Sequence, residues 1–307
     1  MPAVLAFPRL SAADAAPFTV FVSAVRGADT PHCGTVRTPC RTFQAGVDRA
    51  AAAGTVVAVD SGTYGAVVVT KGVTIEAPTG VTALIETVSE IGVDIQAGAQ
   101  DTVVLRGLTL VSQIDLPLSI HGIRVESARS VHIEKCVIDG YAFGIFANAP
   151  APLLLFVTDT SIRGGFSLGA AVNISSLTST IQASFDHCRF EGHGTGLLLQ
   201  VNGTAVARNC SFIGNLFGGA VVSAGPSGTS VELSLENCSA AHIGGPAVNS
   251  SGRNGGSATI RISNCTIVDN VTGVQAFGGG VVLSRGNNTI EGNGTDVSGT
   301  LGAYPAK

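Results

Sequence analysis

The chain reads Ala-Arg-Asn-Cys-Ser-Phe-Ile-Gly at residues 207–214, and related copies of this motif recur on both sides of it. They read Ile-Glu-Lys-Cys-Val-Ile at 133–138, Phe-Asp-His-Cys-Arg-Phe at 185–190, Leu-Glu-Asn-Cys-Ser-Ala at 235–240 and Ile-Ser-Asn-Cys-Thr-Ile at 262–267. The cysteines of the last four copies stand at 188, 210, 238 and 265, a period of roughly 25 residues, which is in the range of solenoid repeats. A repeat of this length decides the fold.

Each copy alternates apolar and polar residues, as a strand buried on one side does. In the first copy, Ile133, Cys136 and Ile138 are therefore expected to face inward. A second apolar run follows each copy after a glycine, as in Gly196-Leu197-Leu198-Leu199. One repeat thus holds two or three short strands and no helix, and such units stack about 4.8 Å apart. The sequence predicts an all-β fold, a right-handed parallel β-helix, with its hand following the rule for parallel crossovers.

Asparagine precedes the cysteine position in several copies. A tight bend between two strands needs a residue in the left-handed backbone conformation, which Asn tolerates better than other non-glycine residues. Amides stacked on successive turns can also hydrogen-bond to one another. We therefore predict a structural column made of Asn209, Asn237, Asn264 and Asn287.

The cysteines of the repeats are predicted to be buried and reduced. Free cysteine behaves as a small buried apolar residue. A metal site needs ligands paired at short spacing, whereas these cysteines lie a whole repeat apart. The residues concerned are Cys136, Cys188, Cys210, Cys238 and Cys265.

Composition favours one elongated domain without a nucleic-acid or membrane role. The chain has 307 residues and a formal net charge of −4. It has no cluster of Lys and Arg, so we expect no nucleic-acid partner. No apolar run approaches the roughly 18 residues of a membrane span. The predicted divisions are a degenerate or truncated export leader at 1–17, an N-terminal cap at 18–54, the β-helix at 55–292 and a C-terminal tail at 293–307.

The segment before the repeats carries a family resemblance. It reads Phe21-Val22-Ser23, Gly27-Ala28-Asp29, Thr38-Pro39-Cys40-Arg41-Thr42-Phe43 and Gly54-Thr55-Val56-Val57-Ala58-Val59-Asp60-Ser61-Gly62-Thr63-Tyr64-Gly65. This resembles the opening of bacterial right-handed parallel β-helix repeat proteins of the pectate-lyase-like superfamily. The similarity is greatest to a largely uncharacterised, usually exported subgroup with a Pro-Cys…Pro-Cys-Lys-Thr-Phe opening, in which His32 here replaces the first Pro and Arg41 the Lys. The resemblance implies the fold and a secreted, periplasmic or cell-surface location, and it implies little about activity.

The same segment contains the elements of a cap. Phe43 and Val47 recur at helical spacing between Thr42, the expected N-cap, and Gly54, the expected C-cap. A short amphipathic helix there would cover the open first turn of the solenoid. Cys33 and Cys40 precede this helix and could close a small loop as a disulfide in an oxidising compartment. A pair of free surface thiols is the alternative.

The two ends of the chain give weaker patterns. Residues 1–17 hold a short apolar patch and small residues, but no Lys or Arg precedes the patch, so we expect a lost or degenerate export signal. After Gly292 the repeat pattern fades and no capping pattern follows. The last turn is expected to be shielded by the tail or by another subunit, which would make the C-terminal turn a place for oligomerisation.

Catalytic motifs of related enzymes are poorly matched. Gly192-His193-Gly194 is similar to the Gly-His-Gly of polygalacturonases, but the Asn-Thr-Asp and Asp-Asp strings of that family do not occur. Aligned on the repeat, His193 takes the position of Asn215, Asn270 and Asn293, which predicts a turn residue. A Ca²⁺ site needs several carboxylates together, whereas the acidic residues here are spread along the repeats. We therefore predict no cofactor and no metal, with Ca²⁺ weakly supported.

Aromatic residues are scarce. The chain has no Trp and 3 Tyr, which are the side chains that combine a broad apolar surface with a polar group. Tyr141, Phe143 and Phe146 form the one aromatic cluster, and we predict that they pack in the core and in a turn.

Charged residues alternate in sign at positions expected to face outward. Two residues before the cysteine position, stacking would bring Arg106 beside Glu134, and Arg208 between Asp186 and Glu236. Three residues after it, stacking would bring Arg163 between Asp139 and Glu191. Opposite charges about 4.8 Å apart on neighbouring turns would help to fix the register.

These residues also define the place to look for a ligand. We name Asp139, Arg163, Glu191 and His193 the candidate ligand patch. Arg163 is predicted to keep both carboxylates ionised, which disfavours a general acid.

Two hypotheses on function follow. The favoured one is a non-catalytic, exported β-helix scaffold that presents a lateral surface to a cell-surface or extracellular partner, a polysaccharide among the candidates. The alternative is a polysaccharide lyase or glycoside hydrolase of the pectate-lyase-like superfamily with a non-standard site.

Overall fold

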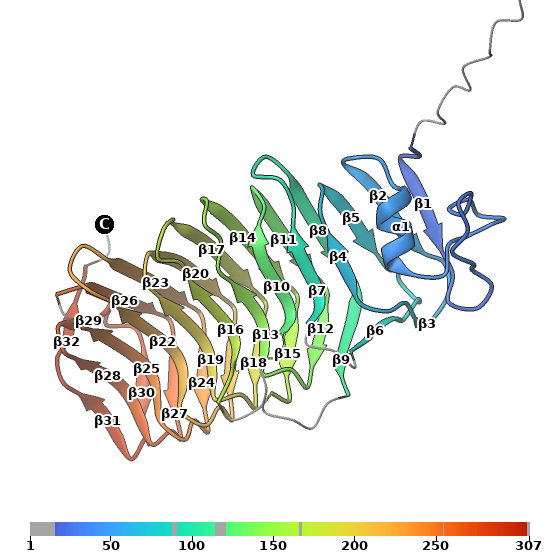
Figure 1. The fold of residues 1–307 in the computed structure, drawn as a ribbon. Coiled ribbons are helices and arrows are strands. Elements are labelled where there is room, and N and C mark those ends of the chain that lie inside the picture. Colours follow the sequence, from blue (N-terminus) through green and yellow to red (C-terminus); the bar gives the residue numbers. More distant parts are fainter. Residues whose placement is uncertain (1–15, 88–90, 114–120, 166–167, 254, 306–307) are drawn as a thin grey trace, which may run out of the picture.

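The structure is a computed structural model that describes residues 16–87, 91–113, 121–165, 168–253 and 255–305. Within these ranges the chain winds into three long parallel sheets that run side by side along an elongated solenoid (Figure 1). The predicted all-β parallel solenoid with one short N-terminal helix is therefore confirmed. Each turn passes from sheet A to sheet B, then to sheet C, and back to sheet A.

Sheet A is the longest of the three and carries the first and last described strands. Every neighbouring pair in it is parallel, as in β1 with β2 and β29 with β32. Its strands are β1 (Thr19–Val22), β2 (Gly54–Ala58), β5 (Val73–Glu76), β8 (Thr102–Arg106), β11 (Ser130–Glu134), β14 (Leu153–Thr158), β17 (Ile181–Asp186), β20 (Gly203–Arg208), β23 (Ser230–Glu236), β26 (Ser257–Ser263), β29 (Gly280–Ser284) and β32 (Leu301–Ala303).

Sheet B consists mostly of strands of three residues, and they follow sheet A after a short corner. Its strands are β3 (Gly62–Thr63), β6 (Ala83–Thr87), β9 (Leu108–Ser112), β12 (Val137–Asp139), β15 (Ser161–Arg163), β18 (Arg189–Glu191), β21 (Ser211–Ile213), β24 (Ser239–Ala241), β27 (Thr266–Val268) and β30 (Thr289–Glu291). Short strands leave little surface on this side of the solenoid for a ligand.

Sheet C completes each turn with mostly longer strands. These are β4 (Val67–Val69), β7 (Ile91–Gln96), β10 (His121–Ser127), β13 (Phe143–Ala147), β16 (Ala170–Ser175), β19 (Thr195–Gln200), β22 (Gly218–Ala224), β25 (Pro246–Gly252), β28 (Thr272–Phe277) and β31 (Thr295–Ser298). It therefore offers one of the two broad outer faces of the solenoid.

The corner between sheets A and B is made by one residue in the left-handed conformation. Seven successive turns place such a residue directly after the sheet A strand, with φ between 50° and 69°. A side chain with a Cβ normally disfavours this region, and Asn and Gly tolerate it best. The corner residues are Gly107, Lys135, Asp159, His187, Asn209, Asn237 and Asn264.

Side chains at this corner form the predicted asparagine column. Asn237 Nδ2 donates to Asn209 Oδ1 at 2.6 Å, and Asn287 Nδ2 donates to Asn264 Oδ1 at 2.9 Å. Asn209 Nδ2 continues the ladder to Asp186 Oδ1 at 2.8 Å. These bonds form two segments, one of Asp186, Asn209 and Asn237 and one of Asn264 and Asn287, and Asn287 joins through its side chain without adopting positive φ.

The core is a set of stacked apolar columns. Phe190 and Phe212 are aligned on neighbouring strands, with ring centroids 5.1 Å apart and planes 26° apart. The free cysteines at the A–B corner are all buried, as predicted. Their thiols donate to backbone carbonyls of the core, such as Cys188 Sγ to Val157 O at 3.4 Å.

The first turn is closed by helix α1 (Phe43–Arg49). Thr42 is its N-cap, as predicted, and its hydroxyl accepts from Ala45 N at 3.1 Å. Gly46 lets the helix approach the sheet, since a Cβ there would lie 2.6 Å from Val56 Cγ1. The helix ends earlier than expected, at Arg49 with Ala50 as its C-cap and not Gly54, and the next amide, Ala51 N, donates to Pro17 O at 2.9 Å.

A disulfide joins Cys33 to Cys40, so the pairing that stood open against free thiols is present. Asp29 braces the same loop by accepting from Arg41 N at 2.6 Å and from Thr42 N at 3.1 Å. Both cysteines are buried against the start of the core. The loop therefore holds helix α1 in place over the first turn.

The predicted division boundaries differ from the observed strands at both ends. Strand β1 lies inside the predicted cap yet pairs with β2 as part of sheet A. Strands β31 and β32 lie inside the predicted tail yet continue sheets C and A. Of the predicted leader, residues 1–15 fall outside the described residues. Among the helices described, none has the length and apolar character needed to cross a membrane.

Burial of the repeat cysteines makes a testable prediction. The five free thiols should not react with a water-soluble disulfide reagent in the native protein, because they are enclosed and burial raises the pKa of Cys136 to about 12. Denaturant without reductant should release all five, while Cys33 and Cys40 stay linked. Colorimetric thiol titration before and after unfolding measures this. Fast native labelling at any corner cysteine would contradict the inward orientation.

Candidate functional site

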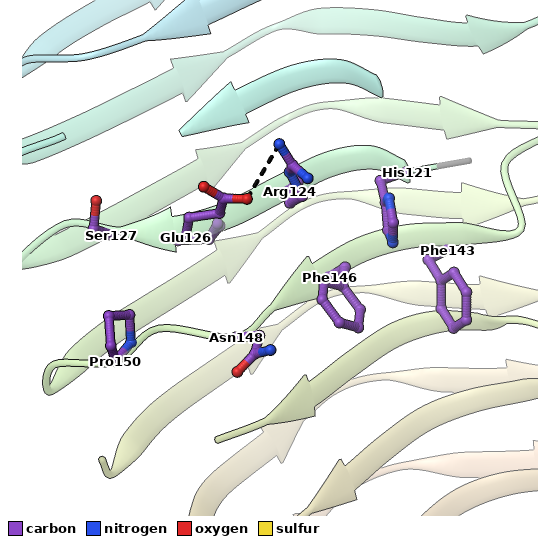
Figure 2. Close-up of a pocket in the computed structure, with 9 residues that line it drawn as sticks. His121, Arg124, Glu126, Ser127, Phe143, Phe146, Asn148 and Pro150 are labelled. Atoms are coloured by element: carbon purple, nitrogen blue, oxygen red, sulfur yellow. Dashed lines mark ion pairs between the residues drawn. The ribbon is translucent and has the colours of Figure 1, made fainter. Parts of the chain in front are cut away.

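A groove lies on the outer face of sheet C, over strands β10 and β13 and the turn that follows β13 (Figure 2). It encloses about 670 Å³. Residues that alternate with inward Ile123 and Val125 on β10 point into it, because successive side chains of a strand face opposite ways. The lining residues are His121, Arg124, Val125, Glu126, Ser127, Phe143, Phe146, Asn148 and Pro150.

Three rings form one wall of the groove. His121 lies beside Phe143, with centroids 5.4 Å apart and planes 21° apart, and 4.8 Å from the ring of Phe146. The two phenylalanines meet edge to face at 5.7 Å. Both are half-buried, so each leaves part of its ring open to a ligand.

The sequence-based prediction for this aromatic cluster was wrong for two of its three members. Tyr141 is fully buried and its hydroxyl pairs with Thr87 Oγ1 at 2.6 Å, as expected for core packing. Phe143 and Phe146 instead flank inward-facing Ile145 and point outward. Alternation with buried Ile145 predicts that Phe146 faces outward, but it would place Phe143 inward, so the sequence contains no such signal for Phe143.

An arginine held by two carboxylates crosses the groove beside the rings. Arg124 Nε and Nη2 donate to the two oxygens of Asp94 at 2.9 and 2.7 Å. The same Nη2 lies 3.1 Å from Glu126 Oε1 (Figure 2). Gln96 Nε2 adds a donor to Asp94 at 2.7 Å. Glu126 in the groove and Asp94 beside it therefore share a cationic partner, and the bidentate pair with Asp94 fixes the geometry of Arg124.

The candidate ligand patch is partly assembled, on sheet B. Asp139, Arg163 and Glu191 occupy one register position on three neighbouring strands, as predicted. Arg163 Nε pairs with Asp139 Oδ2 at 3.0 Å. Glu191 instead pairs with Arg189 of its own strand, at 2.8 Å, and that hydrogen bond is the main cause that lowers the pKa of Glu191. These groups are exposed, and surface pairs contribute about 0–1 kcal/mol.

His193, the fourth member of the patch, has to be withdrawn from it. Its side chain is buried, and its Nδ1–H donates to Glu191 O at 2.9 Å. Its backbone N–H donates to Asn215 Oδ1 at 3.0 Å, and Ile243 N donates to Asn270 Oδ1 in the same way two turns later. The predicted role as a turn residue is confirmed, and an inward ring cannot join a ligand on the surface.

A cluster with metal-ligand atoms occurs in the cap. Among the residues that the structure describes, one group of three or more His, Cys, Asp or Glu side chains converges within 4.8 Å, namely Asp29, Cys33 and Cys40. The two sulfurs are bonded to each other, so they cannot act as thiolate ligands. Asp29 is occupied by the backbone amides of the loop.

Comparison with known proteins gives one match. A family model described as "Right handed beta helix region" matches residues 119–295, which is more than half of the chain. The matched segment contains the strands of the groove and agrees with the predicted hand of the solenoid. No curated protein and no solved structure matches significantly.

The buried position of His193 predicts a pH dependence of stability. Burial is the main cause that lowers the pKa of His193, so the unfolded chain takes up the proton first as the pH falls. The contribution of neutral His193 to the free energy of unfolding is complete above about pH 6.5. It is lost as the pH falls from there toward the lowered pKa of His193 in the folded protein. His193→Asn should remove this component, because Asn fills the equivalent turns.

Denaturant unfolding of both proteins between pH 5 and 8 measures the effect. As a matched variant, His193→Ala should cost about 1–3 kcal/mol at pH 7.5, since it empties a buried site and leaves hydrogen bonds unmade. Equal losses for Asn and Ala, with unchanged pH profiles, would contradict the role assigned to the ring.

Proposed function

We propose, from the premise that the chain belongs to the right-handed β-helix family, that it is a non-catalytic scaffold that binds a polysaccharide in the groove on sheet C. The observation that supports this is the wall of three rings beside fixed polar groups. Sugars present apolar C–H faces and hydroxyl edges together. A binding site for them needs flat apolar surface and oriented hydrogen-bonding groups side by side.

The groove supplies both kinds of contact. Phe143 and Phe146 offer ring surface, and Glu126, Ser127 and Asn148 offer oxygen and nitrogen atoms along the same side (Figure 2). Because Arg124 is fixed by Asp94 and Glu126, these charged groups keep one geometry without a ligand. A preorganised surface binds with a smaller entropic cost.

The lyase or hydrolase alternative finds less support at this groove. A glycosidase needs one carboxylic acid kept protonated and a second carboxylate placed across the bond. Here Asp94 and Glu126 are both ion-paired with Arg124. Charged groups that are held in place by ion pairs are better suited to binding a polysaccharide than to cleaving it.

Export to the cell surface or beyond is part of the same proposal. The Cys33–Cys40 disulfide supports it, because such bonds persist in oxidising compartments. The partner is then an extracellular or cell-surface glycan. The outer edges of β30, β31 and β32 are the place where a second copy of the chain would add strands.

Phe146→Ala tests the proposal. It should weaken polysaccharide binding by about tenfold, because the loss of one stacking ring removes roughly 0.5–1.5 kcal/mol beyond its buried area. The matched control is Phe156→Ala on sheet A, where the ring of Phe156 stacks on His132 at 4.7 Å, away from the groove. Affinity electrophoresis in gels containing neutral or acidic polysaccharides measures both.

The same polysaccharides, followed for new reducing ends and for unsaturated products, should show no cleavage. Equal affinity of Phe146→Ala and the unchanged protein would contradict the assignment of the groove. Robust cleavage that Glu126→Gln abolishes would replace the scaffold by an enzyme.

A further inference from the structure

The outer face of sheet C differs from the other sheets in charge. Six consecutive strands of it, β13, β16, β19, β22, β25 and β28, contain no Asp, Glu, Lys or Arg. On the same turns, sheet A carries the column of Asp186, Arg208 and Glu236, and sheet B carries Arg163 and Glu191. These six strands start at β13, beside the groove, and follow one another toward the C-terminal end of the solenoid (Figure 1).

One outward column runs down the middle of this face. Register pairs Phe146 of the groove with Asn173, then Leu198, Val221 and Asn249 on successive strands. Strands lie about 4.8 Å apart, so Asn249 is about 19 Å from Phe146. The column thus alternates a ring, an amide, two aliphatic side chains and a second amide.

The two amides in the column carry unused acceptors. Asn173 is 8% exposed, and the Oδ1 atoms of Asn173 and Asn249 are buried without a hydrogen-bond partner. A buried polar atom left unpaired is costly, and such atoms are rare in folded proteins. Rotation about χ2 of an Asn side chain is soft, so each carbonyl can turn toward a molecule seated over the column.

We infer that this column is a second binding site that extends the groove, and that its ligand is an uncharged, hydroxyl-rich polymer lying along the solenoid axis. The inference rests on the proposed function and adds the class of ligand. Unpaired carbonyl oxygens require a donor, and each sugar hydroxyl provides one. Leu198 and Val221 give the apolar surface between the two acceptors.

An acidic polysaccharide fits this surface poorly. A uronate carboxylate only accepts hydrogen bonds, so it cannot itself satisfy Asn173 Oδ1 or Asn249 Oδ1, and a uronate has fewer donor hydroxyls than a neutral hexose. No cationic side chain stands on these strands to pair with it. In the groove itself, Arg124 is already engaged by Asp94 and Glu126.

The test compares the full chain with Asn173→Leu and Asn249→Leu. Leucine is close to Asn in size and removes the acceptor. Each variant should bind neutral glycans about tenfold more weakly, as expected when one hydrogen bond of the complex is lost. The thermal midpoint of each free variant should be unchanged or higher, because the unpaired oxygen is gone. Gln182→Leu, an exposed amide on β17 of sheet A, is the matched control.

The probes are hydroxyethylcellulose, glucomannan and dextran as neutral polymers, with polygalacturonate and alginate as acidic ones. Binding to a neutral polymer that both Asn variants weaken, and that Gln182→Leu leaves intact, supports the inference. Binding to acidic polymers alone, weakened by Phe146→Ala, would keep the proposed function and overturn the inference. Binding of a neutral polymer that Phe146→Ala weakens but the two Asn variants do not would also keep the proposed function and overturn the inference.

Two other outcomes are decisive. Failure of every polymer to bind would overturn the proposed function together with the inference. Analytical ultracentrifugation of the same samples covers the case of a second copy seated on the face. A concentration-dependent dimer that Leu198→Lys dissociates would assign the column to self-association and overturn the inference.

Discussion

The left-handed residue between sheets A and B is the constraint on which the rest of the structure depends. It bends the chain within a single residue, so seven successive turns leave sheet A and enter sheet B in register. Equal turns then stack about 4.8 Å apart, and sequence positions become columns. Asn209 and Asn237 stabilise the corner in two ways. Each adopts the left-handed backbone conformation, and their side chains are hydrogen-bonded to each other. Lys135 and His187 adopt the same backbone conformation, and His187 Nδ1 lies 3.1 Å from Asp186 Oδ1.

This constraint explains which features could be predicted from sequence. The asparagine column, the buried cysteines and the charge register all repeat with the corner, so alignment on the motif places them. The partner of Glu191 could not be placed in this way. Alignment compares neighbouring turns, whereas Arg189 lies two residues away on the same strand and faces the same side. Strands β31 and β32 were missed because they lack the motif, and β1, a strand of the predicted cap, was not expected to continue sheet A.

The groove could not be predicted from the sequence, for a different reason. Its rings come from two turns, and His121 meets Phe143 and Phe146 only because β10 and β13 are aligned. No sequence motif indicates that these rings are in contact. Phe143 and Phe146 follow Tyr141 closely in the sequence, and their proximity to it favours a prediction of core packing. The charges of the patch on sheet B repeat with the motif and could be predicted. The unpaired amide oxygens of Asn173 and Asn249 on sheet C have no such pattern.

We propose that the solenoid consists of a scaffold and one binding face. Paired charges on sheets A and B compensate one another, and the face of sheet C holds rings, amides and aliphatic groups in a straight row. A crystal structure of the protein with a neutral glucan oligosaccharide tests this division most directly. We expect sugar rings over Phe146 and hydroxyls donating to Asn173 Oδ1, with the chain along the solenoid axis. Sugar bound at Asp139 and Arg163, with the face of sheet C bare, would contradict it.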